Sequence, residues 1–137
     1  MNEMKNIALL LVICCLFQVF SCKKDSQSEK FKLLTGPVWA SDSLLVNGDD
    51  ASGPGGLLEN FKGDVKFNED YSGNFGSYSG TWRFAFEETQ IVILSDSLPI
   101  PLTAIIRELT ESSLKITTSY QLPQTGAINI RMTFKAK

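Results

Sequence analysis

The stretch AINIRMTFK, residues 127–135, carries the clearest fold signal in the chain. Every second side chain after Ala127 is apolar, and the side chains between them are polar. Because successive side chains of a β-strand point to opposite faces of a sheet, this alternation predicts a strand with one buried and one solvated face. The residues expected to be buried are Ile128, Ile130, Met132 and Phe134.

The same two-residue period recurs from residue 37 onward, in runs separated by segments rich in Gly, Asn, Asp, Ser and Pro. Residues 102–109 also fit a helical period, but the prolines before them and the TESS segment after them favour a strand. We therefore predict an all-β domain over residues 33–137, with about eight antiparallel strands in a meander that closes into an up-and-down barrel. The predicted strands include Trp39–Val46, 65–68, 81–87, Gln90–Leu94, Leu102–Leu109 and 114–120.

The N-terminal segment has the pattern of a secretion signal. Residues 7–20, IALLLVICCLFQVF, form a run of 14 residues that is broken only by Gln18. A membrane-spanning helix needs about 20 apolar residues, so this length is typical of the apolar region of a signal peptide. A polar segment, KKDSQSEK, follows from residue 23. We expect residues 1–21 to be a signal peptide and residues 22–32 to be a flexible tether.

The junction between these segments, Val19-Phe20-Ser21-Cys22, resembles the lipobox of bacterial lipoproteins. The resemblance implies that cleavage leaves Cys22 as the first residue and that Cys22 carries palmitate-like acyl chains. Two or more such chains give stable membrane attachment. Lys23 stands where an aspartate can retain lipoproteins at the inner membrane, which implies the outer membrane of the cell envelope. The periplasmic face and the cell surface both remain open as locations.

Composition excludes several classes of function. The chain of 137 residues contains no histidine, which removes His-dependent acid–base catalysis, Ser–His and Cys–His nucleophiles and His-ligated zinc. A net charge of -2 argues against the basic surface that nucleic-acid binding needs. Cys14 and Cys15 would leave with the signal peptide, so no internal disulfide is expected. We expect no catalytic residues, no metal site, no cofactor and no enzymatic activity.

Short motifs in the mature segment resemble a known family. LTG at residues 34–36 precedes Trp39, VKFN follows at residues 65–68, GTWRF lies at residues 80–84, and an Ile…Leu-Thr…Ser-Leu pattern occupies residues 106–114. In this order, over most of residues 33–136, they resemble the small lipocalin-like lipoproteins common in Bacteroidetes. The resemblance implies a lipocalin-like barrel at the cell envelope and leaves the ligand undefined.

The aromatic residues are the feature with the most potential for binding. An eight-stranded barrel is just wide enough to be filled by side chains or to hold one small ligand. We expect a monomeric binding module for a small apolar or amphipathic molecule, with residues 47–56 as a mobile rim. The alternative is a filled barrel that docks an unidentified protein partner at the envelope, and the size of the interior cavity distinguishes the two. The residues expected to line the interior are Trp39, Phe67, Phe75, Trp82, Phe84, Phe86, Ile116, Met132 and Phe134.

Overall fold

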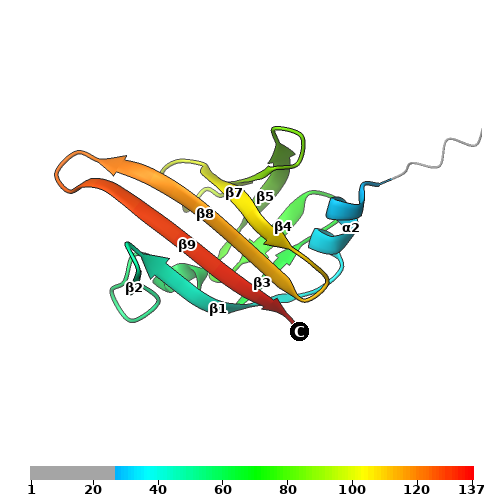
Figure 1. The fold of residues 1–137 in the computed structure, drawn as a ribbon, viewed down its shortest axis with the longest axis horizontal. Helices are drawn as coiled ribbons and strands as arrows, with labels where there is room; N and C mark the ends of the chain where they lie inside the picture. Colours follow the sequence, from blue (N-terminus) through cyan, green and yellow to red (C-terminus); the bar gives the residue numbers. More distant parts are fainter. Residues whose placement is uncertain (1–26) are drawn as a thin grey trace, which may run out of the picture.

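The longest hairpin, formed by β8 (Ser113–Leu122) and β9 (Gly126–Ala136), contains the alternating C-terminal stretch (Figure 1). The computed structural model describes residues 27–137. In it the four apolar side chains of the stretch are buried, whereas Asn129 and Arg131 are exposed. The predicted half-buried strand is therefore confirmed.

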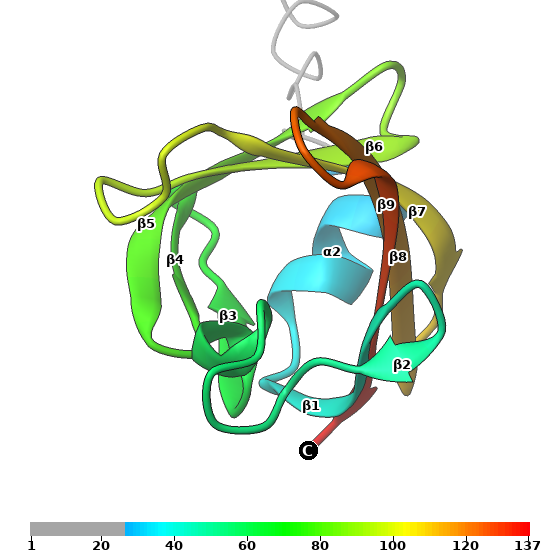
Figure 2. The ribbon, with the colours of Figure 1, turned by 90° about the vertical axis from the view of Figure 1, so that its left-hand side faces the viewer.

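The strands close into a ring, which Figure 2 shows from one end. Consecutive strands pair antiparallel, and β1 (Trp39–Val46) pairs with β9 to complete the ring. Of the nine strands in the described residues, the two-residue β2 (Asp49–Asp50) pairs only with β1, across an Asn-Gly turn. The other eight strands form the barrel, and the predicted fold is confirmed. The other elements are η1 (Glu59–Phe61), β3 (Asp64–Phe67), β4 (Ser72–Phe75), β5 (Tyr78–Ala85), β6 (Gln90–Leu94) and β7 (Leu102–Leu109).

Two β-bulges change which face of a strand points inward. In β1 the pairing with β9 shifts between Ser41 and Ser43, so Trp39 and Leu44 are both buried although five positions separate them. In β7 the pairing with β8 shifts between Ile106 and Glu108. Each extra residue reverses the inside–outside alternation beyond it, which lets a curved strand keep its apolar residues on the core side.

A short helix, α2 (Glu29–Thr35), covers one end of the barrel (Figure 2). The Ser28 side chain accepts a hydrogen bond from the Phe31 N–H at 3.0 Å and so caps the helix. Phe31 and Leu34 are buried in the core. The predicted tether over residues 22–32 therefore extends too far, because Phe31 supplies an apolar anchor that holds residues 29–32 in the folded domain.

The C-terminal end of α2 is fastened to the barrel wall by polar contacts. The Lys66 ammonium donates to the backbone carbonyls of Thr35, Gly36 and Pro37. The Trp39 indole N–H donates to the Leu34 carbonyl at 3.0 Å. Because the last carbonyls of a helix lack partners within the helix, these donors satisfy groups that would otherwise be unpaired.

Two facing glycines allow the strands to approach closely on one side of the ring. Gly73 in β4 lies opposite Gly80 in β5. A Cβ added at Gly80 would lie 1.9 Å from the Leu94 carbonyl oxygen, which is backbone at the end of β6. Only a residue without a side chain fits there.

The turn between β5 and β6 places one predicted interior residue outside the barrel. Phe86, Glu87 and Glu88 all have positive φ, at 49°, 54° and 62°. This left-handed turn ends the alternation at Ala85, and the Phe86 side chain is 74% exposed. The prediction that Phe86 lies in the interior is therefore wrong. The Glu88 carboxylate accepts a hydrogen bond from Ser28 Oγ at 2.6 Å, which joins the turn to the start of α2.

Candidate functional site

The barrel interior is filled at the α2 end by an aromatic cluster around Trp82. The Trp82 ring lies 5.5 Å from Phe67, 5.7 Å from Phe31 and 5.3 Å from Phe84, measured between ring centroids. Its indole N–H donates to the Asn68 carbonyl at 3.0 Å. These contacts leave this half of the barrel packed, as the filled-barrel alternative expects.

The other half of the barrel contains an apolar cavity of about 280 Å³ that opens at the end opposite α2. Its walls come from the β8–β9 hairpin, the start of β7 and the start of β5, and loops on two sides complete it. Figure 2 looks at the barrel from this open end. The lining residues are Leu57, Leu58, Phe61, Tyr78, Leu98, Pro99, Ile100, Leu102, Tyr120, Gln121, Leu122, Ile128, Ile130 and Met132.

The cavity has a buried floor and an exposed apolar rim. Ile130 and Met132, from the centre of β9, are buried and form part of the floor. At the rim, Leu57 is 58% exposed, Ile100 is 55% exposed and Leu122 is 37% exposed. These three side chains come from three separate segments around the opening, so the apolar surface continues from the cavity to the outside.

The lining contains no Asp, Glu, Lys or Arg side chain. Its polar side chains are those of Tyr78, Tyr120 and Gln121. The Tyr78 hydroxyl oxygen accepts a hydrogen bond from Asn60 Nδ2 at 3.4 Å. Burial raises the pKa of Tyr120 above its ordinary value, so this phenol is neutral at physiological pH. The cavity therefore offers an apolar surface and a few neutral polar groups.

Of the predicted interior residues, Met132 alone lines this cavity. Phe86 lies outside the barrel, and Phe84 is half-buried against the aromatic cluster. Cys22 lies outside the described residues. The remaining predicted residues are buried in the packed core: Trp39, Phe67, Phe75, Trp82, Ile116 and Phe134.

The sequence prediction missed most of the cavity because it chose mainly aromatic side chains as the interior lining, whereas the cavity is lined mainly by aliphatic residues. Some of these, such as Ile130, lie in a predicted strand, and others, such as Leu57, lie between the predicted strands. Residues 47–56, predicted as the rim, do not reach the main cavity, whereas Leu57 and Leu58 directly after them do. Backbone hydrogen bonds hold this loop, including Leu58 N–H to the Ala51 carbonyl at 2.9 Å. The available signal was large apolar residues between the predicted strands, as in LL at residues 57–58 and LPI at residues 98–100.

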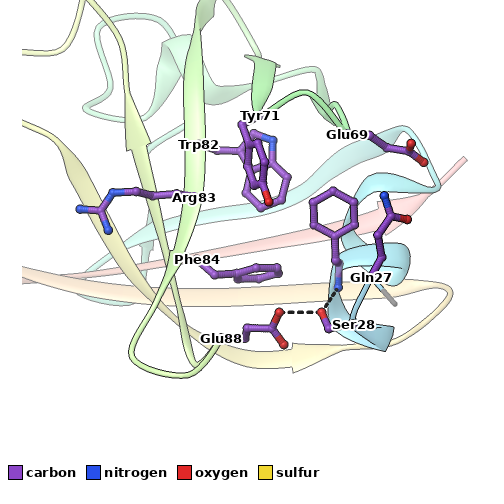
Figure 3. A pocket seen from close by; sticks show the side chains of 9 residues that line it. Gln27, Ser28, Glu69, Tyr71, Trp82, Arg83, Phe84 and Glu88 are labelled. Carbon is purple, nitrogen blue, oxygen red and sulfur yellow. Dashed lines mark hydrogen bonds between the residues drawn. The ribbon is translucent and has the colours of Figure 1, made fainter. Parts of the chain in front are cut away.

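A second hollow of about 730 Å³ lies at the α2 end, between the start of α2 and β5 (Figure 3). Tyr71 and Trp82 form its aromatic side, with ring centroids 5.2 Å apart, and Glu69, Arg83 and Glu88 border it. The packed cluster closes its floor, so it does not continue into the interior. The cavity at the opposite end has a mainly apolar lining without a charged side chain and is the candidate site.

No family model and no curated protein matches this sequence. Over residues 27–137, no helix is long and apolar enough to cross a membrane. Within the same residues, no group of three or more Cys, His, Asp or Glu side chains is placed to hold a metal ion.

Proposed function

We propose that the protein is a non-enzymatic binding protein that holds one small, neutral and mainly apolar molecule in the cavity at the open end of the barrel. The observation that carries this proposal is an apolar cavity at the open end of the barrel, framed by strands of a closed barrel and lined without a charged side chain. Apolar pockets with a few placed polar groups are the usual form of small-molecule sites, and barrel mouths are among their usual locations.

The volume of the cavity limits the size of the ligand. About 280 Å³ lies just below the lower end of the range for small-molecule sites, ~300 Å³, and equals roughly nine water volumes at ~30 Å³ each. The aromatic cluster prevents the cavity from continuing toward α2. A compact molecule therefore fits better than a long acyl chain.

The lining also favours a neutral ligand over a charged one. Transfer of a carboxylate or ammonium group from water into an apolar site is costly unless an opposite charge or several hydrogen bonds compensate. No lining side chain carries a charge, and the polar side chains of the lining are those of Tyr78, Tyr120 and Gln121. A neutral ligand with one hydroxyl or carbonyl group matches this set.

A pair of dyes tests both the site and its charge preference. N-phenylnaphthylamine is neutral, and anilinonaphthalenesulfonate has the same ring system with an added sulfonate. We expect saturable, one-to-one fluorescence enhancement with the neutral dye and binding of the sulfonated dye weaker by about tenfold or more, which corresponds to about 1.4 kcal/mol.

Variants locate the bound dye. Ile128→Trp fills the cavity from its wall, and Ile100→Asp places a charge at its exposed rim; each is expected to weaken neutral-dye binding by about tenfold. Ile105→Trp is the matched control, because Ile105 is exposed and lies outside the cavity. If Ile128→Trp does not fold, Ile100→Asp decides. Wild-type affinity in folded cavity variants, or no saturable binding at all, would contradict the proposal.

We also propose that the barrel is attached to the envelope, on the outer membrane, through a lipid on Cys22. The support is the apolar run that ends at the lipobox-like junction. In a bacterial host with two membranes, we expect the protein to incorporate an alkyne-labelled palmitate and to enter the detergent phase. Cys22→Ala should remove the label, whereas Cys15→Ala should retain it. A label that persists in Cys22→Ala, or is absent from the wild type, would refute the anchor.

The second candidate function is docking of a protein partner at the envelope. The exposed rim residues Leu57, Ile100 and Leu122 favour it, because a partner could cover them together. The dye titration separates the two functions. Docking alone predicts no saturable response to the neutral dye, while small-molecule binding predicts one that Ile128→Trp reduces.

A further inference from the structure

The outer wall of the barrel carries a polar groove of about 560 Å³ over β1, β7, β8 and β9. Two of the three arginines in the chain, Arg107 and Arg131, line it. Arg131 projects from β9 between buried Ile130 and Met132, so it faces outward where its neighbours face the interior. The groove is therefore separate from the cavity inside the barrel.

Both arginines flank the same threonine on β8. Arg131 lies directly opposite Thr117 in the β8–β9 pair, a position at which side chains begin about 5 Å apart. Arg107 lies at the bulge of β7, and its Nε donates to Thr117 Oγ1 at 2.9 Å. Three adjacent strands thus bring two guanidinium groups to one place on a rigid sheet.

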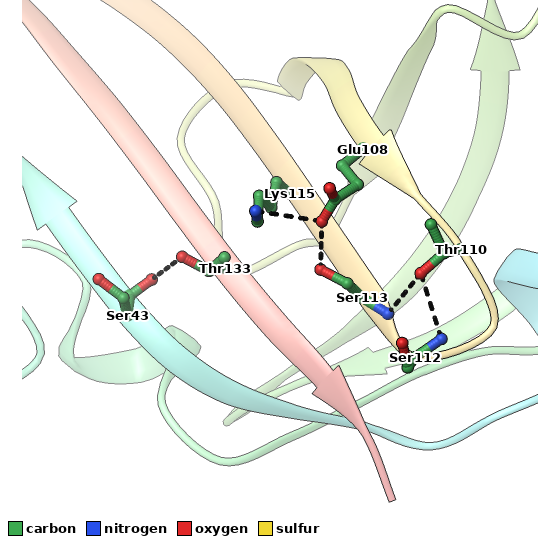
Figure 4. Close-up of polar contacts among 7 residues, drawn as sticks. All are labelled: Ser43, Glu108, Thr110, Ser112, Ser113, Lys115 and Thr133. Carbon is green, nitrogen blue, oxygen red and sulfur yellow. Dashed lines mark hydrogen bonds and ion pairs between the residues drawn. The ribbon is translucent and has the colours of Figure 1, made fainter.

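Neither arginine is neutralised within residues 27–137, where every ion pair joins a lysine to a carboxylate. Glu108 follows Arg107 in sequence but accepts from Ser113 Oγ and pairs with Lys115 at 3.2 Å (Figure 4). These two donors lower the pKa of Glu108, which keeps it ionised and engaged. The positive charge of the two arginines is therefore not offset by this neighbouring carboxylate.

A carboxylate on the other side of Arg131, that of Asp50, is also engaged. Leu45 in β1 pairs with Arg131 on one side and with Asp50 on the other, so Asp50 lies two strands, about 10 Å, from Arg131. The Asp50 carboxylate accepts the Ser52 N–H and hydroxyl hydrogen bonds, and these lower its pKa.

Hydroxyl and amide groups extend the groove beside the arginines. Ser119 Oγ donates to Asn129 Oδ1 at 2.7 Å, and the Asn129 N–H donates to Asn47 Oδ1 at 2.9 Å. The first bond fixes the side-chain amide of Asn129, which lines the groove. Such groups suit the hydroxyls of a saccharide, while a guanidinium matches a phosphate through two parallel hydrogen bonds.

We propose that this groove binds a phosphorylated sugar, with Arg107 and Arg131 on the phosphate and the Ser119–Asn129 region on the sugar hydroxyls. The site is independent of the apolar cavity. A sugar phosphate would cover Thr117 and bridge β7 to β9 on the outer wall.

The test is an NMR titration of the folded domain with glucose monophosphate, inorganic phosphate and glucose as separate probes. Glucose monophosphate is expected to shift the amide signals of Thr117 and Arg131 saturably, and to bind more tightly than either other probe. Added salt should weaken this binding, because the contact is ionic. Absence of saturation, or equal affinity for inorganic phosphate or for glucose, would overturn the proposal.

Variants connect the shifts to the two arginines. Arg131→Gln and Arg107→Gln are each expected to weaken glucose monophosphate binding by about tenfold. Arg83→Gln removes the third arginine, which lies at the α2 end, and should leave the affinity unchanged. The Arg131→Gln protein should bind the neutral dye normally, so failure of this site and failure of the apolar cavity are distinguishable. Arginine-dependent binding to anionic vesicles without binding to glucose monophosphate would also overturn the proposal.

Discussion

Gly80→Ala is expected to unfold the barrel or to lower its Tm by more than about 10 °C. The added Cβ would meet the Leu94 carbonyl oxygen at 1.9 Å and the Ser95 Cα at 3.0 Å. Both atoms are backbone, so no rotamer change can relieve the contact, and β5 and β6 must separate. A forced backbone shift of this kind belongs to the small group of single substitutions that cost several kcal/mol.

Thermal denaturation followed by far-UV circular dichroism measures this effect. Gly53→Ala is the matched control, because an added Cβ at Gly53 meets no atom within 4 Å and its φ is not positive. The control is expected to change stability by no more than about 0.5 kcal/mol. Similar Tm values for the two variants would show that β5 and β6 do not approach as closely as the structure has them.

Trp82→Ala is expected to destabilise the domain by about 3–5 kcal/mol. The Trp82 side chain is 1% exposed and joins α2 to the barrel through its contact with Phe31, and β3 to β5 through its contact with Phe67. Its removal leaves a large cavity and removes one of the two hydrogen bonds that the Asn68 carbonyl accepts, the other of which comes from the Tyr71 N–H. The measurement is urea unfolding, in which the midpoint reports the change in free energy if the slope is unchanged.

Trp82→Phe separates the two contributions at this position. The phenyl ring retains much of the aromatic packing but cannot donate to the Asn68 carbonyl, so we expect a smaller loss than for alanine. If Trp82→Ala remains folded, its affinity for the neutral dye should stay near that of the wild type, because Trp82 does not line the cavity. A loss of less than about 1 kcal/mol for Trp82→Ala would contradict the role of Trp82 as the centre of the cluster.

The strands were predictable because most of them depend on a local property, the alternation of apolar and polar side chains. The bounds of β1 and β7 were predicted instead from their apolar runs and the turn signals around them, since residues 102–109 also fit a helical period. Both strands contain bulges. The bulges themselves depend on pairing with distant strands, since β1 meets β9 about ninety residues later. No local pattern reports such pairing.

The candidate site was less predictable than the fold. Aromatic residues such as Trp82 and Phe67 were expected to line a cavity, but large rings pack against one another and fill the space. The cavity forms instead where aliphatic residues of loops, such as Leu57 and Ile100, extend beyond the packed rings. Helix α2 was missed because its one turn of apolar residues, with Phe31 and Leu34, lies next to a polar segment.

The position of α2 determines where a surface or a tag can be attached without covering the cavity opening. The described chain enters at Gln27 beside α2, and the backbone N–H of Lys137 donates to the Val38 carbonyl at that same end (Figure 1). Both ends of the described chain therefore lie away from the cavity opening. A biosensor surface, a fluorescent fusion partner or an affinity tag joined at either end would leave the opening in contact with solution. Ligand exchange could then be recorded on immobilised protein without a long spacer.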